Sequence, residues 1–397
     1  MAEFSFRGKI PASKSIFNRA LIVQSFFPVM DLHGFSECED VRHLREGLKE
    51  IRNRSRIDCG DGGTTFRFMA LRAARQLGVH VLEGSPRLME RPLRGLLDLL
   101  QQLGVQVRQK RNELYIVSKG WQKPRKPLLV DVSESSQFAS ALALNAWLLD
   151  FDLEFELVGE KVSESYFEMT MKMLKYLGMR YRKTAKGYLI PKEQRLEKLS
   201  FDIEADMSST FTIAAAGALA GRSVIENFPV QSEQPDKVFV EIFKRMGIQT
   251  SFENAAENEQ EKILKVSASS LRAVDCDLSQ APDLFPVLAV LCSWAQGTSK
   301  LHNAPQLANK ESHRIHKVAE LLSLVGVQHE ILEDGIIIHG NPEQKKIKRG
   351  RFNPDKDHRM VMAAALMKLK GHDIVIEEPQ VINKSFPEFW EMIGLKA

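Results

Sequence analysis

The sequence predicts an α/β protein of two domains built from repeated helix-and-hairpin units, and three observations support this. The chain has 397 residues, which favours two domains over one. Its content of 44% hydrophobic and 27% charged residues is ordinary for a globular protein. A helical apolar pattern that ends at a glycine recurs four times, and an extended segment with a hairpin pattern follows each time.

The glycines explain why each helix should stop where it does. Glycine adopts the left-handed backbone conformation without a steric penalty, so it commonly ends a helix. One such helix end means little, whereas four at similar spacing favour a real repeat. The four stretches are Leu96–Val107, Met169–Tyr181, Val238–Thr250 and Val318–His329, with Gly104, Gly178, Gly247 and Gly326.

Hairpins are expected directly after these helices. The first expected hairpin joins Val105–Arg108 to Glu113–Val117. Another joins Val327–Leu332 to Gly335–His339. Asn112, Lys186-Gly187 and Asp334-Gly335 are suitable turn residues. The repeats are too long and uneven for a solenoid, so we expect globular domains of repeated α/β units.

The charge and the cysteines indicate which partners to expect. The net charge of +4 is spread along the chain, and its densest cluster, Lys345–Arg349, is interpreted as a solvated loop rather than a nucleic-acid contact. No run of 18 apolar residues occurs, and Met1–Arg7 has no apolar core, so no membrane segment or secretion signal is expected.

The cysteines point to a reducing compartment. Cys38, Cys59, Cys276 and Cys292 form no Cys-x-x-Cys pair and no zinc-like spacing with histidine. Four free thiols in the cytosol are the simplest interpretation, and we expect a cytoplasmic protein without a metal.

The first polar motifs lie before expected helices. In Pro11–Ala20, Lys14, Ser15 and Arg19 suit a phosphate or carboxylate at the start of a helix, although an N-cap with a charged first turn explains them equally well. The glycine-rich turn in Asp58–Arg67 opens another helix, and its backbone amides are able to bind an anion.

Two further motifs have structural alternatives. If Gly84–Pro92 is helical, Arg87 and Arg91 share a face and form a pair of guanidiniums for an oxyanion; a surface Arg–Glu pair is the alternative. Ser133–Phe138 precedes an apolar helix expected over Ala139–Leu149, and by itself it is better interpreted as an N-cap. Asp206–Ser209 is interpreted in the same structural way.

The last motifs contain carboxylates among cations. Asp283 follows a proline at a helix start, where it suits either a cap or a catalytic carboxylate. Lys310 and Arg314 are four residues apart and are expected on one helix face, with Glu311 beside them. The two remaining motifs are Asp357–Met360 and Asn383–Pro387.

Together the motifs predict binding of two multiply charged anions. Nearly all are cations, hydroxyls or backbone amides at helix starts, the groups that bind anions. Asp61, Asp283 and Glu311 lie among these cations, and such mixtures tune proton-transfer groups.

In order and spacing, the motifs from about Gly8 to Gly394 resemble the 5-enolpyruvylshikimate-3-phosphate synthase family. The resemblance implies two domains, each of three βαβαββ-like units around a pseudo-threefold axis, with helix N-termini facing an interdomain cleft. It places residues 1–10 and 230–397 in one domain and 11–229 in the other. The chain would cross between them near Lys9–Ala12 and Asn227–Ser232.

The resemblance also implies a reaction without a metal or organic cofactor. The enolpyruvyl group of phosphoenolpyruvate would pass to the 5-hydroxyl of shikimate 3-phosphate by addition and elimination, in a monomer. The implied catalytic residues are Lys14, Asp283 and Glu311. The implied shikimate 3-phosphate ligands are Lys14, Ser15, Arg19, Ser135, Ser136, Gln137, Ser163, Tyr166, Asp283, Gln306 and Lys310. The implied phosphoenolpyruvate ligands are Lys14, Gly63, Thr64, Arg91, Gln137, Arg314, Arg359 and Lys384.

Three features depart from the family pattern and leave alternatives open. Asp61 and Gln306 stand where asparagine is usual, and Leu48–Asp58 is too short for the family's hairpin there. The sister enzyme that acts on a UDP-linked N-acetylglucosamine commonly has a loop cysteine, which Gly84–Pro92 lacks. A non-catalytic anion-binding relative is the second alternative.

Overall fold

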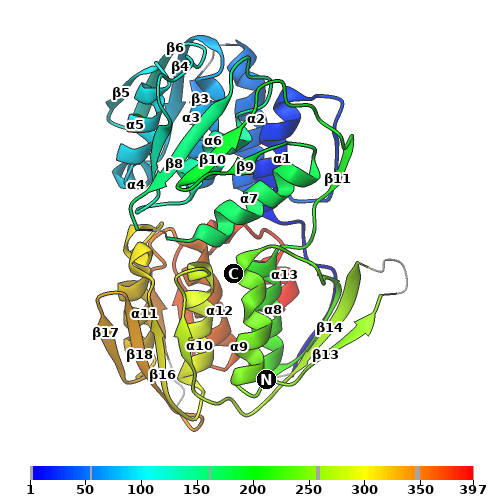
Figure 1. Ribbon diagram of the computed structural model, residues 1–397. Coiled ribbons are helices and arrows are strands. Elements are labelled where there is room, and N and C mark those ends of the chain that lie inside the picture. The colour runs from blue at the N-terminus through cyan, green and yellow to red at the C-terminus, as the bar shows by residue number, and fades with distance from the viewer. Residues whose placement is uncertain (1–2, 54–55, 161, 256–259, 345–348, 397) are drawn as a thin grey trace. The chain divides into compact units, whose positions relative to one another are not determined.

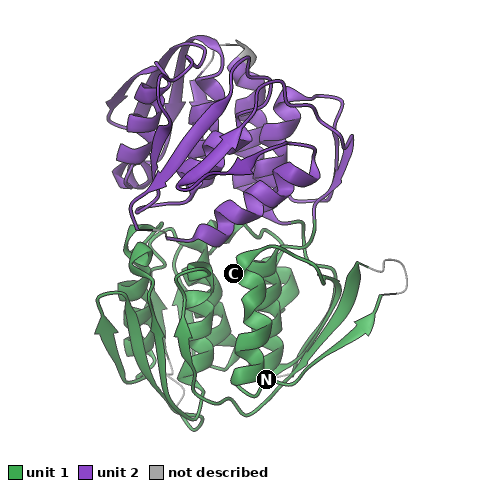
Figure 2. Cartoon of the chain, viewed as in Figure 1, with its two compact units in different colours: residues 1–12, 204–397 green, residues 13–203 purple. Residues whose placement is uncertain are grey.

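The computed structural model describes residues 3–53, 56–160, 162–255, 260–344 and 349–396. The chain forms two compact units, coloured separately in Figure 2. The first unit comprises residues 1–12 and 204–397, and the second comprises residues 13–203. Lys345–Lys348, most of the basic cluster noted above, lie outside the described residues.

Four four-stranded sheets share one mixed topology. In one of them, β3 (Arg56–Asp58) runs parallel to β4 (Leu77–Glu83), which is antiparallel to β6 (Glu113–Lys119), and β6 forms a hairpin with β5 (Gln106–Lys110).

The other three sheets repeat this order: β7 (Leu128–Asp131), β8 (Leu153–Val158), β10 (Gly187–Ile190) and β9 (Arg182–Lys183); β15 (Asp275–Asp277), β16 (Gly297–His302), β18 (Gly335–Gly340) and β17 (His329–Leu332); β1 (Phe4–Gly8), β12 (Gly221–Pro229), β14 (Glu261–Ser267) and β13 (Thr250–Asn254). Small mixed sheets therefore recur along the chain.

Two smaller sheets consist of one parallel pair each. They are β11 (Ser200–Asp202) with β2 (Asp31–His33), and β19 (Gly350–Phe352) with β20 (Ile374–Ile376). Helix α2 (Glu39–Asn53) continues almost to β3, which begins at Arg56, so no hairpin fits between them. The short stretch at Leu48–Asp58 thus reduces one repeat to its parallel pair.

The glycine-ended helices form as predicted. Helices α5 (Arg94–Gln102), α7 (Glu164–Tyr176), α9 (Phe239–Arg245) and α11 (Arg314–Leu324) each precede one of the four hairpins. The glycine after each helix has a left-handed φ: Gly104 76°, Gly178 106°, Gly247 76° and Gly326 74°. The local conformational preference of glycine therefore ends all four helices.

Three apolar helices pack together at the centre of each unit. They are α1 (Lys14–Phe26), α3 (Gly63–Ala73) and α6 (Gln137–Leu144) in the second unit, and α8 (Met207–Ala220), α10 (Phe285–Ser293) and α12 (His358–Leu369) in the first. Every residue of α10 is buried, as expected for a helix that is apolar on all sides. Figure 1 shows α8, α10 and α12 within the first unit, with sheet strands outside them.

Two boundaries differ from the sequence expectation. The chain passes between the units after residue 203 rather than near 229. The reason is that β12 pairs with β1 and β14, which holds it and α8 in the first unit. Helix α6 ends at Leu144 rather than Leu149: Leu148 has a φ of 56°, and the Arg75 guanidinium donates to the carbonyl of Trp147 at 2.8 Å.

All four cysteines are buried free thiols. In the part of the chain that the structure describes, no helix has the length and hydrophobicity needed to span a bilayer. Over the same residues, no group of three or more histidine, cysteine or acidic side chains is arranged to hold a metal ion.

Candidate functional site

In each unit, polar side chains gather at the N-terminal ends of the central helices. In the first unit Arg359 of α12 contacts Ser208 of α8 and Asp283, which lies just before α10. In the second unit Gln137 of α6 donates from Nε2 to the hydroxyl of Thr64 of α3 at 3.0 Å. Because helix N-termini carry unpaired amides and partial positive charge, each end is suited to an anion.

Asp283 is surrounded by three cations in the first unit. Its Oδ1 lies 2.8 Å from Nη1 of Arg314 and 3.3 Å from Nζ of Lys310, and its Oδ2 lies 2.9 Å from Nη2 of Arg359. Burial alone would raise the pKa of Asp283, but the charges of Arg359, Lys310 and Arg314 outweigh it and hold the pKa well below its ordinary value. Asp283 is therefore ionised at neutral pH.

Glu311 joins the same cluster from the other side of Arg314. Its Oε2 lies 3.1 Å from Nη2 of Arg314, and its Oε1 lies 2.8 Å from Nζ of Lys384. The two carboxylates expected to transfer protons thus share one guanidinium, and each has a further cation from a distant segment.

Arg314 is the centre of this cluster. It is also paired with the buried Asp357, from Nε to Oδ2 at 2.8 Å and from Nη2 to Oδ1 at 3.2 Å. Burial lowers the pKa of Arg314, but the charges of Asp357, Asp283 and Glu311 more than reverse this and raise it above its ordinary value. Asp357 also caps α12 by accepting from the Arg359 amide at 3.0 Å.

One sequence interpretation of this cluster needs correction, and the structure excludes one of the two alternatives given for Asp283. Lys310 and Arg314 do not share a helix face, because α11 begins only at Arg314 and Lys310 is extended. They meet because both reach Asp283. Asp283 lies in the 3₁₀ turn Pro282–Leu284, and its carboxylate pairs with cations instead of capping the helix.

In the second unit, Lys14 is paired rather than isolated. Its Nζ lies 2.9 Å from Oδ2 of Asp40, a buried residue near the start of α2. The Asp40 backbone carbonyl accepts from the Thr65 hydroxyl at 3.1 Å, which ties this carboxylate to the start of α3. The lysine and the glycine-rich turn are thereby held on one packed surface.

Arg19 is fixed one turn further along α1. Its Nη1 donates to the Ser15 hydroxyl at 2.8 Å, its Nε donates to the Thr170 hydroxyl at 2.7 Å, and its Nη2 donates to the Tyr166 carbonyl at 3.3 Å. Burial lowers the pKa of Arg19 to about 10, so it is still charged at neutral pH. Three residues expected to bind shikimate 3-phosphate, Ser15, Arg19 and Tyr166, are therefore brought together.

Gln137 connects α6 to α3. Its Oε1 accepts from Nη1 of Arg67 at 2.6 Å, and its backbone amide donates to the Ser135 hydroxyl at 3.2 Å. The polar cluster before α6 is thus more than the N-cap favoured from its sequence, because its side chains reach two residues of α3, Arg67 and Thr64.

For Arg87 the alternative, a surface pair with a glutamate, is the arrangement that forms. Helix α4 covers Pro86–Glu90, and Arg91 follows it with a φ of −66° and a ψ of 151°. Arg87 forms the surface pair with Glu90 at 3.6 Å. Arg91 instead lies over Gly63: a Cβ atom added to Gly63 would come 2.8 Å from Nη1 of Arg91.

Ser163, Gln306 and Asp61 each lie in a different local environment. Ser163, before α7, has the left-handed φ of 52° that is uncommon for serine. Gln306 is buried and donates from Nε2 to the Ser279 carbonyl at 3.1 Å. Asp61 is partly exposed in the turn before α3.

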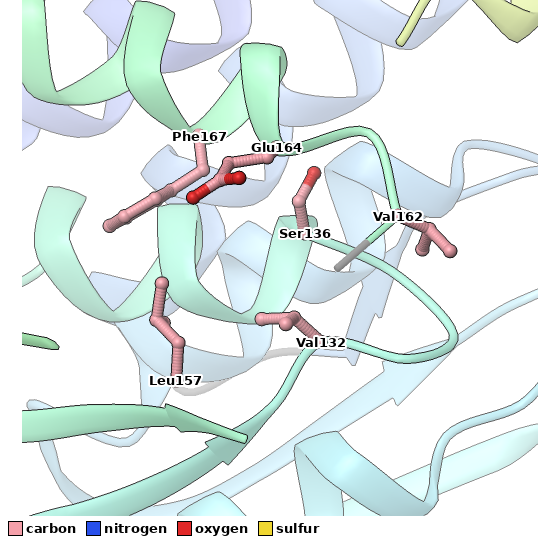
Figure 3. Close-up of a pocket in the computed structure, with 6 residues that line it drawn as sticks. All are labelled: Val132, Ser136, Leu157, Val162, Glu164 and Phe167. Carbon is pink, nitrogen blue, oxygen red and sulfur yellow. The ribbon is translucent and has the colours of Figure 1, made fainter. Parts of the chain in front are cut away.

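A small pocket lies beside Ser136, shown in Figure 3. The empty space at this pocket is about 190 Å³, a volume that includes open solvent. Ser136 and Glu164 contribute polar groups, and the other walls are apolar: Val132, Leu157, Val162 and Phe167. Of the predicted site residues only Ser136 lines it, so this pocket does not coincide with the polar cluster at Asp283 or with the one at Lys14.

Sequence reasoning missed several contacting residues: Asp40, Arg67, Ser208, Asp236 and Asp357. Arg67 and Asp357 lie in motifs already noted, but no role was assigned to them. Asp40 and Asp236 had no local signal, because the groups they contact are distant in sequence. Ser208 follows Asp206, whose side chain does cap α8 by accepting from the Ser209 amide at 2.8 Å, as predicted.

Comparison with known proteins supports the resemblance. Residues 31–393 match the family described as EPSP synthase (3-phosphoshikimate 1-carboxyvinyltransferase). A 3-phosphoshikimate 1-carboxyvinyltransferase from Syntrophobacter fumaroxidans is 33% identical, over 84% of this chain and 78% of its own length. A 3-phosphoshikimate 1-carboxyvinyltransferase from Clostridium kluyveri is 30% identical, over 96% of this chain and 93% of its own length. The structure of EPSP synthase from Acinetobacter baumannii superposes with a TM-score of 0.76 at 21% identity, over 99% of this chain and 95% of that one.

Proposed function

Because the chain belongs to the EPSP synthase (3-phosphoshikimate 1-carboxyvinyltransferase) family, we propose that it transfers the enolpyruvyl group of phosphoenolpyruvate to the 5-hydroxyl of shikimate 3-phosphate. Phosphate is the second product. The observation that carries the proposal is the cluster at Asp283, where three cations and a second carboxylate, Glu311, meet at helix starts. This cluster offers charge for an anion and two groups for proton transfer in one place.

Shikimate 3-phosphate is assigned to the groups that already form hydrogen-bonded sets. Ser15 and Arg19 bind its phosphate together with Ser135, Ser136, Ser163 and Tyr166. Arg19 favours this role because its guanidinium is rigidly held by Thr170 and Tyr166, and a preorganised donor loses little freedom on binding. Lys14, Gln137, Asp283, Gln306 and Lys310 complete the assigned ligands.

Phosphoenolpyruvate is assigned to the remaining cations and to the glycine turn. Arg314, Arg359 and Lys384 come from the first unit, and Lys14, Arg91, Gly63, Thr64 and Gln137 from the second. Within each unit we propose three α/β repeats around a pseudo-threefold axis, a proposal supported by the shared sheet topology.

The reaction is an addition followed by an elimination. Glu311, as an acid, protonates the methylene carbon of phosphoenolpyruvate, while Asp283 accepts the proton of the 5-hydroxyl as its oxygen bonds to the adjacent carbon. In the elimination Glu311, now a carboxylate, takes back one proton from the methyl group of the tetrahedral intermediate. Phosphate leaves with the proton held by Asp283, and the enol ether forms. Lys14 and the arginines stabilise the developing negative charge.

The cation cluster explains how Asp283 becomes an effective base. The three cations that hold its pKa down are the groups assigned to the anionic substrates. When they turn toward a bound anion, their stabilisation of the Asp283 carboxylate weakens and its pKa rises. Asp283 thus becomes more basic when the anion binds. While the site is empty, its low pKa limits unproductive proton transfer.

A phosphate-release assay tests the function. Purified protein with phosphoenolpyruvate and shikimate 3-phosphate should release phosphate and form the enol ether. Release with UDP-N-acetylglucosamine as the acceptor instead would identify the sister activity. Calorimetric binding of shikimate 3-phosphate without any phosphate release would identify a non-catalytic anion-binding protein. We further propose that the protein acts as a monomer in the cytoplasm without a cofactor.

A further inference from the structure

A buried carboxylate that the reaction does not use lies behind Arg359. Asp236, in the 3₁₀ turn Pro235–Val238, is 3% exposed and accepts a hydrogen bond at Oδ2 from the hydroxyl of Ser208. The same hydroxyl oxygen accepts from Nη2 of Arg359 at 3.0 Å. Asp236, Ser208 and Arg359 therefore form one continuous chain of hydrogen bonds.

The direction of this chain is determined by chemistry. A serine hydroxyl has one hydrogen to donate, and here it points to Asp236. The oxygen lone pairs then face Arg359, which has only donors. Without an acceptor at position 236, the hydroxyl is able to turn its hydrogen elsewhere and no longer has a fixed orientation toward the guanidinium.

Ser208 and Asp283 together define the plane of the Arg359 guanidinium. The nitrogen Nη2 carries two hydrogens; one is donated to Ser208 at 3.0 Å and the other to Asp283 Oδ2 at 2.9 Å. Two acceptors on one nitrogen restrict rotation of the whole planar group. When an anion draws Arg359 away from Asp283, Ser208 is the acceptor that still holds Nη2.

The segment that carries Asp236 is attached independently to the start of α8. Gln234 accepts from the Met207 amide at Oε1, 3.1 Å, and donates from Nε2 to the Ala205 carbonyl at 2.8 Å. Two residues further on, Asp236 meets Ser208 of the same helix. These attachments hold the carboxylate in place without help from the cations of the site.

We propose that Asp236 is a positioning residue for Arg359, acting through Ser208, and that it sets the affinity for the carboxylate or phosphate of phosphoenolpyruvate. This inference rests on the proposed function, in which Arg359 binds phosphoenolpyruvate. Electrostatics supports it: burial raises the pKa of Asp236 to about 6, the negative charge of Asp283 adds to the increase, and the positive charge of Arg359 opposes it. The three groups are therefore close enough to influence one another's charge.

The test compares steady-state constants in the full-length protein. Asp236→Ala and Ser208→Ala should each raise KM for phosphoenolpyruvate about tenfold, as expected for loss of one hydrogen bond to a charged group. KM for shikimate 3-phosphate should change less than about twofold, because Asp283, the assigned ligand of that substrate that contacts Arg359, is also held by Arg314 and Lys310. Asp236→Asn can still present an acceptor to Ser208, so it should lie much closer to wild type than Asp236→Ala does.

The controls separate positioning from a general structural role. Glu233→Gln removes an exposed carboxylate three residues away and should leave both KM values unchanged. Thermal unfolding establishes that each variant is folded. If Asp236→Ala does not fold, the KM values of Ser208→Ala and Asp236→Asn test the inference instead. Equal changes for both substrates, or an unchanged KM for phosphoenolpyruvate in folded Ser208→Ala, would overturn the inference. A wild-type protein that releases no phosphate contradicts the proposed function instead, so the two failures are distinguishable.

Discussion

Nη1 of Arg314 donates to Oδ1 of Asp283 at 2.8 Å, and only 1% of the Arg314 side chain is exposed. One buried guanidinium thus holds the carboxylate assigned as the base, while Nε and Nη2 contact Asp357 and Glu311. Arg314 is therefore expected to contribute both to the proposed catalysis and to the stability of the fold. Experiments can separate the two contributions.

Replacement of Arg314 should damage stability as well as activity. Arg314→Met leaves the buried Asp357 without its guanidinium partner, and breaking a buried ion pair costs about 3–5 kcal/mol. Urea unfolding followed by circular dichroism measures the loss. The control Arg351→Met removes an exposed pair with Glu377 and should change the free energy of unfolding by less than about 1 kcal/mol. Equal stabilities of the two variants would show that the cluster is not a folding element.

Lys14 should affect activity more than stability. Because its ammonium is partly exposed, Lys14→Met should abolish phosphate release and lower the melting temperature less than Arg314→Met does, although it leaves the buried Asp40 carboxylate without this cation. Lys49→Met on the exposed side of α2 is the matched control and should be fully active. Normal turnover in folded Lys14→Met would remove Lys14 from the site.

The two carboxylates should affect rate more than binding. Asp283→Asn and Glu311→Gln preserve size but remove a proton acceptor or donor, and such groups contribute about 10²–10⁴-fold to rate. Single-turnover rates and calorimetric affinities for shikimate 3-phosphate separate the two effects. The exposed Glu320→Gln serves as the control. A variant that loses affinity but keeps its single-turnover rate would identify that residue as a ligand only.

Gly63 should determine the room available beside Arg91. A methyl group there would lie 2.8 Å from Nη1 of Arg91, so Gly63→Ala must displace the guanidinium. We expect a higher KM for phosphoenolpyruvate with an unchanged KM for shikimate 3-phosphate. Glyphosate, a small phosphonate and carboxylate, should compete with phosphoenolpyruvate in the wild type and bind more weakly to the variant. Inhibition that persists at saturating phosphoenolpyruvate would contradict the shared binding site.

Local features were predictable because they depend on nearby residues. Gly104 and its three counterparts end helices through a backbone preference that belongs to glycine itself, and the hairpins follow from short-range alternation. The polar motifs at helix starts were also visible, since capping and anion binding select the same small set of residue types. The resemblance of those motifs to one family then indicated the chemistry.

Pairing between distant segments was not predictable. Asp283 contacts Lys310, Arg314 and Arg359, which come from separate elements. The sequence spacing instead suggested that Lys310 and Arg314 share a helix face. Arg87 and Arg91 were expected to form one oxyanion site, whereas Arg87 pairs with Glu90 and Arg91 lies over Gly63 of a distant turn. These contacts depend on how sheets and helices pack, and periodicity along the chain contains no information about that.

By itself, the sequence determined the repeated α/β units, the helix ends and the types of side chain that bind anions, because each depends on conformational preferences over a few residues. Only the tertiary structure decided that β12 joins β1 and places α8 in the first unit, and that Asp236 lies behind Ser208 and Arg359. The physical reason is that strand pairing and the burial of a carboxylate are settled by contacts between segments far apart in the chain, which form only when the core packs.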